Sequence, residues 1–197
     1  MHRTALRIAA ASLVLAPTMA FAHSGHDGAS LIHGFMHPLG GVDHIIAMVA
    51  VGLLAARLRG RALWLVPASF VAVMAVAGLT GAADVELPYA ETGIAVSVVA
   101  LGAIVVLRLT MPVAAAMALV GFCAIFHGYA HGAEMPQTAS GLLYGLGFVA
   151  ATALLHGLGV GIGLLVGRID AGYGRKLVRV AGSAAAVVGV ALLANAV

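Results

Sequence analysis

Long apolar stretches, separated by short polar connectors, make up most of this chain. Six of them lie at residues 32–56, 62–82, 90–107, 112–131, 139–167 and 177–197. Each is long enough to cross about 30 Å of hydrocarbon as a helix, and a helix satisfies its own backbone hydrogen bonds in lipid. The pattern predicts an all-α, polytopic membrane protein, with one bundle of six transmembrane helices over residues 32–197.

Residues 1–22 have the features of a cleavable signal peptide. They combine a basic start, an apolar run that is short for a membrane span, and the A-x-A cleavage site Ala20-Phe21-Ala22. We expect the mature chain to begin with a short, histidine-bearing periplasmic tip at residues 23–31.

Charged residues separate onto the two sides of this six-span arrangement. All eight Lys and Arg residues of the mature chain fall on one side: Arg57, Arg59, Arg61, Arg108, Arg168, Arg175, Lys176 and Arg179. The other side carries only carboxylates: Asp27, Asp84, Glu86, Glu91 and Glu134. Since basic loops stay in the cytoplasm, we expect both mature termini in the periplasm and the chain in the bacterial inner membrane.

Composition narrows the function further. Only 9% of the residues are charged and the mean hydropathy is +1.10, which excludes a soluble enzyme with a hydrated surface. The pI near 9.5 reflects orientation in the membrane, so no nucleic-acid partner is expected. The nine histidines are the unexpected feature, because imidazoles are costly in lipid unless a partner or a function retains them.

A first cluster of histidines and a carboxylate is predicted near the periplasmic end of the first span. Pro38 and the pair Gly40-Gly41 should break or loosen the helix there. Asp43 and His44 then begin a resumed helix, and His37 folds back near them. As an isolated residue, Asp43 would be interpreted as a simple helix cap.

A second cluster consists of His127, His131 and Glu134. Their i, i+4, i+7 spacing stacks all three on one face of a continuous helix. His127 lies about 22 Å along its span, at the depth of the first cluster. Two imidazoles one turn apart with a carboxylate form half of a divalent-metal site. Two clusters at one depth, where single polar groups would be penalised, suggest a shared ligand.

His156 lies deeper, about 25 Å along the fifth span and towards the cytoplasm. It is either a packed residue or a lower ligand on a transport path. The glycine pairs 157/161 and 159/163 predict close helix packing around it.

Four further residues are weaker metal candidates: His23, His26, His33 and Cys123. The two histidines of the tip could equally be solvated, and a lone cysteine one turn from His127 is more typical of packing. A single cysteine also excludes an internal disulfide.

Taken together, the two histidine motifs resemble those of a known family. The H-x5-D-H pattern at His37 to His44, followed by F-H-G-x-A-H-G-x-E at Phe126 to Glu134, resembles the HupE/UreJ family over essentially the whole chain. Members of that family are nickel, sometimes cobalt, permeases associated with hydrogenase or urease maturation. The resemblance implies functional roles for His37, Asp43, His44, His127, His131 and Glu134.

The expected function is therefore uptake of Ni²⁺ or Co²⁺, with the ion as cargo, no tightly bound cofactor and no enzymatic activity. Metallochaperones or nickel enzymes would be downstream partners. The chain has no Walker-type phosphate loop, so it does not itself hydrolyse ATP. One alternative is an intramembrane zinc hydrolase with Glu134 as the base, although the chain lacks H-E-x-x-H and an obvious nucleophile. Another is a haem-binding electron carrier with two histidine ligands.

Overall fold

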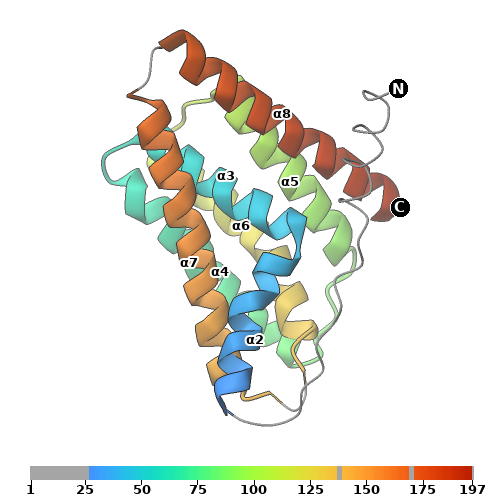
Figure 1. Cartoon of the computed structure of the whole chain (residues 1–197). Coiled ribbons are helices and arrows are strands. Elements are labelled where there is room, and N and C mark those ends of the chain that lie inside the picture. The colour runs from blue at the N-terminus through green and yellow to red at the C-terminus, as the bar shows by residue number, and fades with distance from the viewer. Residues whose placement is uncertain (1–26, 137–138, 169–170, 197) are drawn as a thin grey trace, which may run out of the picture.

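A computed structural model of the chain describes residues 27–136, 139–168 and 171–196. Over these residues the chain is entirely helical, without a β-strand (Figure 1). The helices are α2 (Asp27–Gly40), α3 (Val42–Leu58), α4 (Ala62–Ala82), α5 (Ala90–Leu107), α6 (Val113–Ala133), α7 (Gly141–Val166) and α8 (Ala171–Ala196). The predicted signal peptide at residues 1–22 lies outside the described residues, and so do His23 and His26 of the predicted tip.

The helices confirm the predicted all-α, polytopic membrane protein. Within the described ranges, five helices are long and apolar enough to cross a membrane, namely α4, α5, α6, α7 and the apolar part of α8. The pair α2 and α3 forms a sixth candidate span, bent by 83° at its break. The helical structure also begins earlier than predicted, because α2 already starts at Asp27, within the segment 23–31.

The break in the first span lies where the sequence predicts it. Gly41 has an extended backbone, with φ −101° and ψ 121°, and separates the two helices. Pro38 lies in the last turn of α2 and has no N–H to continue the hydrogen-bond ladder. The first span is therefore a corner and not a straight rod.

Glycines set the closest helix contacts. A side chain at Gly128 of α6 would collide with the Met74 backbone of α4, so these two helices pack backbone to backbone. Gly159 of α7 packs in the same way against Val49 of α3. The prediction that Gly157 and Gly161 pack closely is wrong, because no atom of another described helix lies within 4 Å of the place a Cβ would take at either position.

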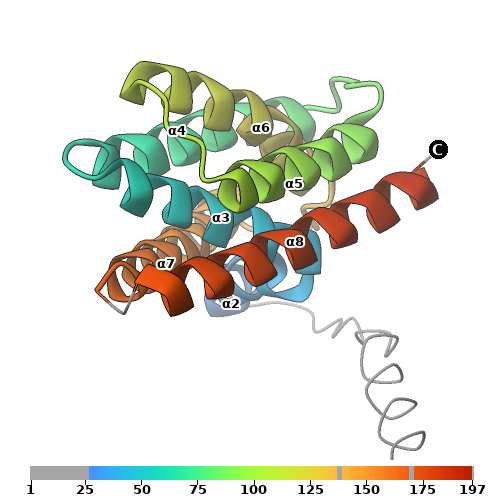
Figure 2. The ribbon, with the colours of Figure 1, turned by 90° about the horizontal axis from the view of Figure 1, so that it is seen from above.

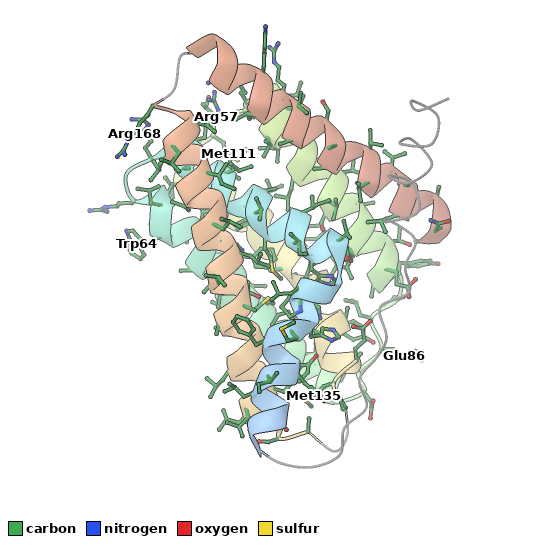
Figure 3. All side chains as sticks on the ribbon, viewed as in Figure 1. Arg57, Trp64, Glu86, Met111, Met135 and Arg168 are labelled. Carbon is green, nitrogen blue, oxygen red and sulfur yellow. The ribbon has the colours of Figure 1, made fainter. Side chains whose placement is uncertain are left out.

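Figure 2 shows α3 at the centre of the bundle, with α4 and α6 on one side of it and α7 on the other. The two ends of the bundle differ in charge. Arg57 and Arg168 lie at one end and Glu86 at the other (Figure 3). At the basic end the Arg57 side chain donates a hydrogen bond to the Arg108 carbonyl oxygen at 2.8 Å, so two basic connectors meet there. This separation of charge agrees with the pattern in the sequence.

Candidate metal site

The corner between α2 and α3 brings two histidines onto one ring of α6. The ring centroid of His131 lies 4.9 Å from that of His37 on α2 and 4.1 Å from that of His44 on α3. In a straight helix, residues seven apart are separated by about 10.5 Å of rise. Breaking the span therefore allows His37 and His44 to contact the same imidazole, and the two predicted clusters meet at His131.

The outer part of this cluster is a triad of two accessible side chains and the buried His131. His37, His131 and Glu134 each offer one ligand atom, and these atoms all lie within 4.8 Å of one another. Nε2 of His37 is 3.0 Å from a carboxylate oxygen of Glu134, which accepts the hydrogen bond. The side chain of Glu134 is 58% exposed and that of His37 is 31% exposed, so a cation can reach them from the acidic end of the bundle.

The next part is buried and begins with His44. Its Nδ1 lies 2.9 Å from the Asp43 carboxylate, which accepts the hydrogen bond. The other ring nitrogen, Nε2, is buried and has no hydrogen-bond partner among the described residues. A carboxylate that holds one imidazole nitrogen while the other is free is the usual arrangement of a metal-binding histidine. Asp43 therefore orients His44 in addition to carrying charge.

His127 is fully buried and is oriented by a residue outside both sequence motifs. The Ser97 hydroxyl on α5 donates its proton to the Ile94 carbonyl oxygen at 2.7 Å. Its oxygen lies 2.8 Å from Nε2 of His127, so it must accept from an N–H there. Nε2 therefore carries the proton, and the lone pair of His127 is on Nδ1, which has no partner in the described structure.

Ser97 could have been noticed in the sequence. It is the one hydroxyl in the interior of an otherwise apolar span, but its spacing gives no indication of its partner. Tyr144 and Phe148 of α7 were likewise not predicted. Phe148 packs against His131 with ring centroids 4.1 Å apart, and Tyr144 lies 5.9 Å from His37. These two rings form an apolar wall on one side of the imidazoles.

Four buried ring nitrogens in this cluster have no hydrogen-bond partner in the described part of the chain: His44 Nε2, His127 Nδ1 and both nitrogens of His131. An unsatisfied buried polar group typically costs about 1–3 kcal/mol. Burying these groups is thus costly for structure alone, whereas a divalent cation bound by the one lone pair that each neutral imidazole offers would offset part of the cost. Neutral imidazoles with carboxylates suit Ni²⁺, Co²⁺ or Zn²⁺.

The imidazoles form a continuous series that leads into the bundle. The His44 ring is followed by that of His127, with centroids 5.1 Å apart. Phe70 of α4 comes next, 5.9 Å from His127, and His156 of α7 lies 5.1 Å beyond Phe70. These two distances put His127 and His156 at most about 11 Å apart, and both nitrogens of His156 lack partners among the described residues.

The remaining weaker candidates do not join this series. Cys123 is a buried free thiol at 3% exposure, and no hydrogen bond connects it to an imidazole in the described structure. His33 is half-buried one turn before His37, and among the described side chains it shares no ring contact with the cluster.

Comparison with known proteins identifies the family of this chain. The family model described as HupE / UreJ protein matches residues 11–192. Protein HupE of Rhizobium leguminosarum bv. viciae is 44% identical over 178 residues, which cover 90% of this chain and 91% of that protein. No solved structure matches significantly. The chain belongs to the HupE/UreJ family.

Proposed function

We propose that this HupE/UreJ family member takes up Ni²⁺, or Co²⁺, across the bacterial inner membrane. The proposal rests on the series of imidazoles. It begins at the accessible His37, which is paired with Glu134, and leads to the fully buried His127. A cation that loses hydration water at the entrance finds a nitrogen ligand at each following step. His131 contacts both His37 and His44 and has no hydrogen-bond partner at either nitrogen among the described residues, so its one lone pair is free to bind the ion between the entrance and the buried part.

The proposed ligand set joins both sequence motifs: His37, Asp43, His44, His127, His131 and Glu134. Imidazole and carboxylate ligands favour Ni²⁺ and Co²⁺ over hard cations such as Mg²⁺. Asp43 and Glu134 together supply two negative charges, which balance those of a divalent ion. His156 is proposed as a second station, which receives the ion after His127.

The charge distribution supports the direction. The acidic end of the bundle, with Glu134, faces the periplasm if the basic connectors remain in the cytoplasm. An inside-negative potential then favours entry by about 2.3 kcal/mol per charge per 100 mV, and twice that for a divalent ion. The ion would be delivered to cytoplasmic metallochaperones or nickel enzymes.

Transport explains more of the geometry than zinc-dependent hydrolysis does. A hydrolase needs one metal with an open position for water and a nearby base. It gives no reason for a series of imidazoles that extends inward beyond the carboxylates. The unpartnered His156 lies beyond His44, His127 and Phe70 in the series of ring contacts, so it has a role in binding metal only if the cation moves.

Uptake of radioactive Ni²⁺ tests the proposal, in cells without other nickel importers and with competing Co²⁺ or Zn²⁺. A double variant with His127→Ala and His131→Ala should lose uptake while its level in the membrane stays near that of the wild type. Single Asp43→Ala and His44→Ala variants should also lose most of the uptake. Normal uptake by the double variant would rule out this cluster as the metal site.

A further inference from the structure

Phe70 interrupts the series of imidazoles. Its ring contacts both His127 and His156, with centroid distances of 5.9 and 5.1 Å, and its side chain is fully buried. In the described part of the chain, no ring contact joins these two imidazoles directly. Before this point each ring in the series is an imidazole that contacts the next imidazole. At Phe70 the contact passes through a phenyl ring, which has no lone pair to replace a water ligand.

The phenyl ring is a barrier in this conformation. Protein interiors are packed without gaps large enough for an ion, and the buried ring of Phe70 packs against both histidines. A divalent cation that follows this series of contacts from His127 to His156 therefore needs the ring to move. When the ring has rotated, its face can still stabilise a partly dehydrated cation through its quadrupole.

The neighbours of Phe70 allow such a movement. Pro67, three residues earlier on α4, has no N–H and so leaves the helix ladder one hydrogen bond short. Met74 follows one turn later on the same face, and its flexible thioether adapts its shape easily. The Thr152 hydroxyl donates only a weak bond to the Met74 sulfur, at 3.8 Å. The α4 backbone is packed tightly on Gly128 of α6 at Met74 itself, so the freedom is confined to the Met74 side chain and to the segment before it, around Phe70.

We propose that Phe70 is the gate of the transport path, which closes the outer imidazole cluster off from His156 and opens by rotation of its ring. This inference rests on the proposed transport function. The gate would also contribute to selectivity. A cation that the outer imidazoles do not bind would dissociate before the Phe70 ring rotates, and so would not pass.

The direct test measures access to the position of His156 and needs no nickel. In a Cys123→Ser background, His156→Cys supplies a single thiol below the gate. A membrane-impermeant cationic methanethiosulfonate reagent is added to intact spheroplasts, and labelling is followed by mass spectrometry. Adding Phe70→Ala should speed the labelling at least ~10-fold, because the packed ring that excludes the reagent is gone. Phe70→Leu should give an intermediate rate.

The matched control is Phe126→Ala, which removes the same ring from α6. Phe126 packs on Phe122 and against Gly93, and although it precedes His127 in the chain, its ring contacts no imidazole among the described residues. It should leave labelling at residue 156 unchanged. Equal labelling rates with and without the Phe70→Ala substitution would overturn the gate, and so would equal acceleration by Phe126→Ala.

A second arm uses proteoliposomes and keeps the proposal testable where Phe70→Ala folds poorly. Phe70→Trp places a larger ring at the same position, which should rotate less easily in the packed interior. Ni²⁺ flux should therefore fall at least ~5-fold while Ni²⁺ affinity at the outer cluster is retained. Wild-type flux through the Phe70→Trp variant would contradict the gate. Absence of Ni²⁺ flux in the wild-type protein would instead contradict the transport function, and the labelling arm would still judge the gate.

Discussion

Replacing Ser97 by Ala tests whether the outer cluster is pre-organised for metal. The Ser97 oxygen lies 2.8 Å from Nε2 of His127, and its own proton is used by the Ile94 carbonyl. Ala removes the acceptor but leaves the helix intact. His127 then either buries an unsatisfied N–H or moves its proton to Nδ1, the nitrogen that would bind the ion.

The magnitude follows from two independent considerations. A buried N–H without an acceptor costs about 1–3 kcal/mol. Groups that orient a metal-bound histidine typically change metal affinity about 10–100-fold when removed. That range corresponds to about 1.4–2.8 kcal/mol, so the two figures agree. We expect Ser97→Ala to weaken Ni²⁺ binding about 10–100-fold, and Ser97→Thr, which keeps a hydroxyl, to restore most of the affinity.

Calorimetric titration of detergent-purified protein with Ni²⁺ measures the affinity. Nitrogen-15 spectra of the histidine side chains report which ring nitrogen carries the proton, a readout that a merely structural role would not change. Ser69→Ala is the matched control, because Ser69 makes the same hydroxyl-to-carbonyl bond to Val66 on α4, at 2.8 Å, without contacting an imidazole. If Ser97→Ala binds Ni²⁺ as tightly as Ser69→Ala and the histidine spectrum is unchanged, Ser97 does not position His127.

Other parts of the structure lead to three further predictions. Single cysteines in a Cys123-free background should react with impermeant thiol reagents in spheroplasts at Glu86 but not at Gly60, and the reverse result would invert the orientation. A Cβ at Gly41 would lie 2.6 Å from the imidazole and 2.7 Å from the carboxylate of the pair that begins α3, whereas Gly40 has open space; Gly41→Ala should therefore lose Ni²⁺ affinity in titrations and Gly40→Ala should keep it. His156→Ala should retain Ni²⁺ binding in purified protein and lose flux in proteoliposomes, while loss of thermal stability with normal flux per folded molecule would indicate a packing residue.

Much of the fold could be predicted from the sequence because membrane helices are local objects. Each apolar stretch satisfies its own hydrogen bonds, so length and hydropathy define it without knowledge of its neighbours. The break at Gly40-Gly41 was also predictable, since Pro38 and adjacent glycines weaken a helix whatever surrounds it. The glycine contacts were less predictable, because spacing marks a small-residue face without saying which face meets another helix. Gly157 and Gly159 illustrate this, since both belong to predicted packing pairs but only Gly159 packs against α3.

The candidate site was predictable as a set of residues but not as an arrangement. Motif spacing grouped His127, His131 and Glu134 on one face, whereas the structure joins His131 and Glu134 with His37 and joins His127 with Ser97. These contacts lie between helices far apart in sequence, so periodicity within one helix contains no information about them. Phe70 is the extreme case, since nothing in its local sequence distinguishes it from an ordinary core phenylalanine.

Helix dipoles add a reason for the broken first span. His37 lies in the last turn of α2 and His131 in the last turn of α6, so two helix C-termini, each with about half a negative charge, approach the entrance. The N-terminus of α3 meets the same cluster and carries the opposite partial charge, which would repel a cation. Asp43 lies in its first turn, and its carboxylate both offsets that charge and bonds to His44. A continuous helix would provide neither terminus, because its backbone groups would be paired along its whole length. The corner thus has two effects. It brings His37 and His44 into contact with the His131 ring, and it provides an electrostatic environment that favours a cation.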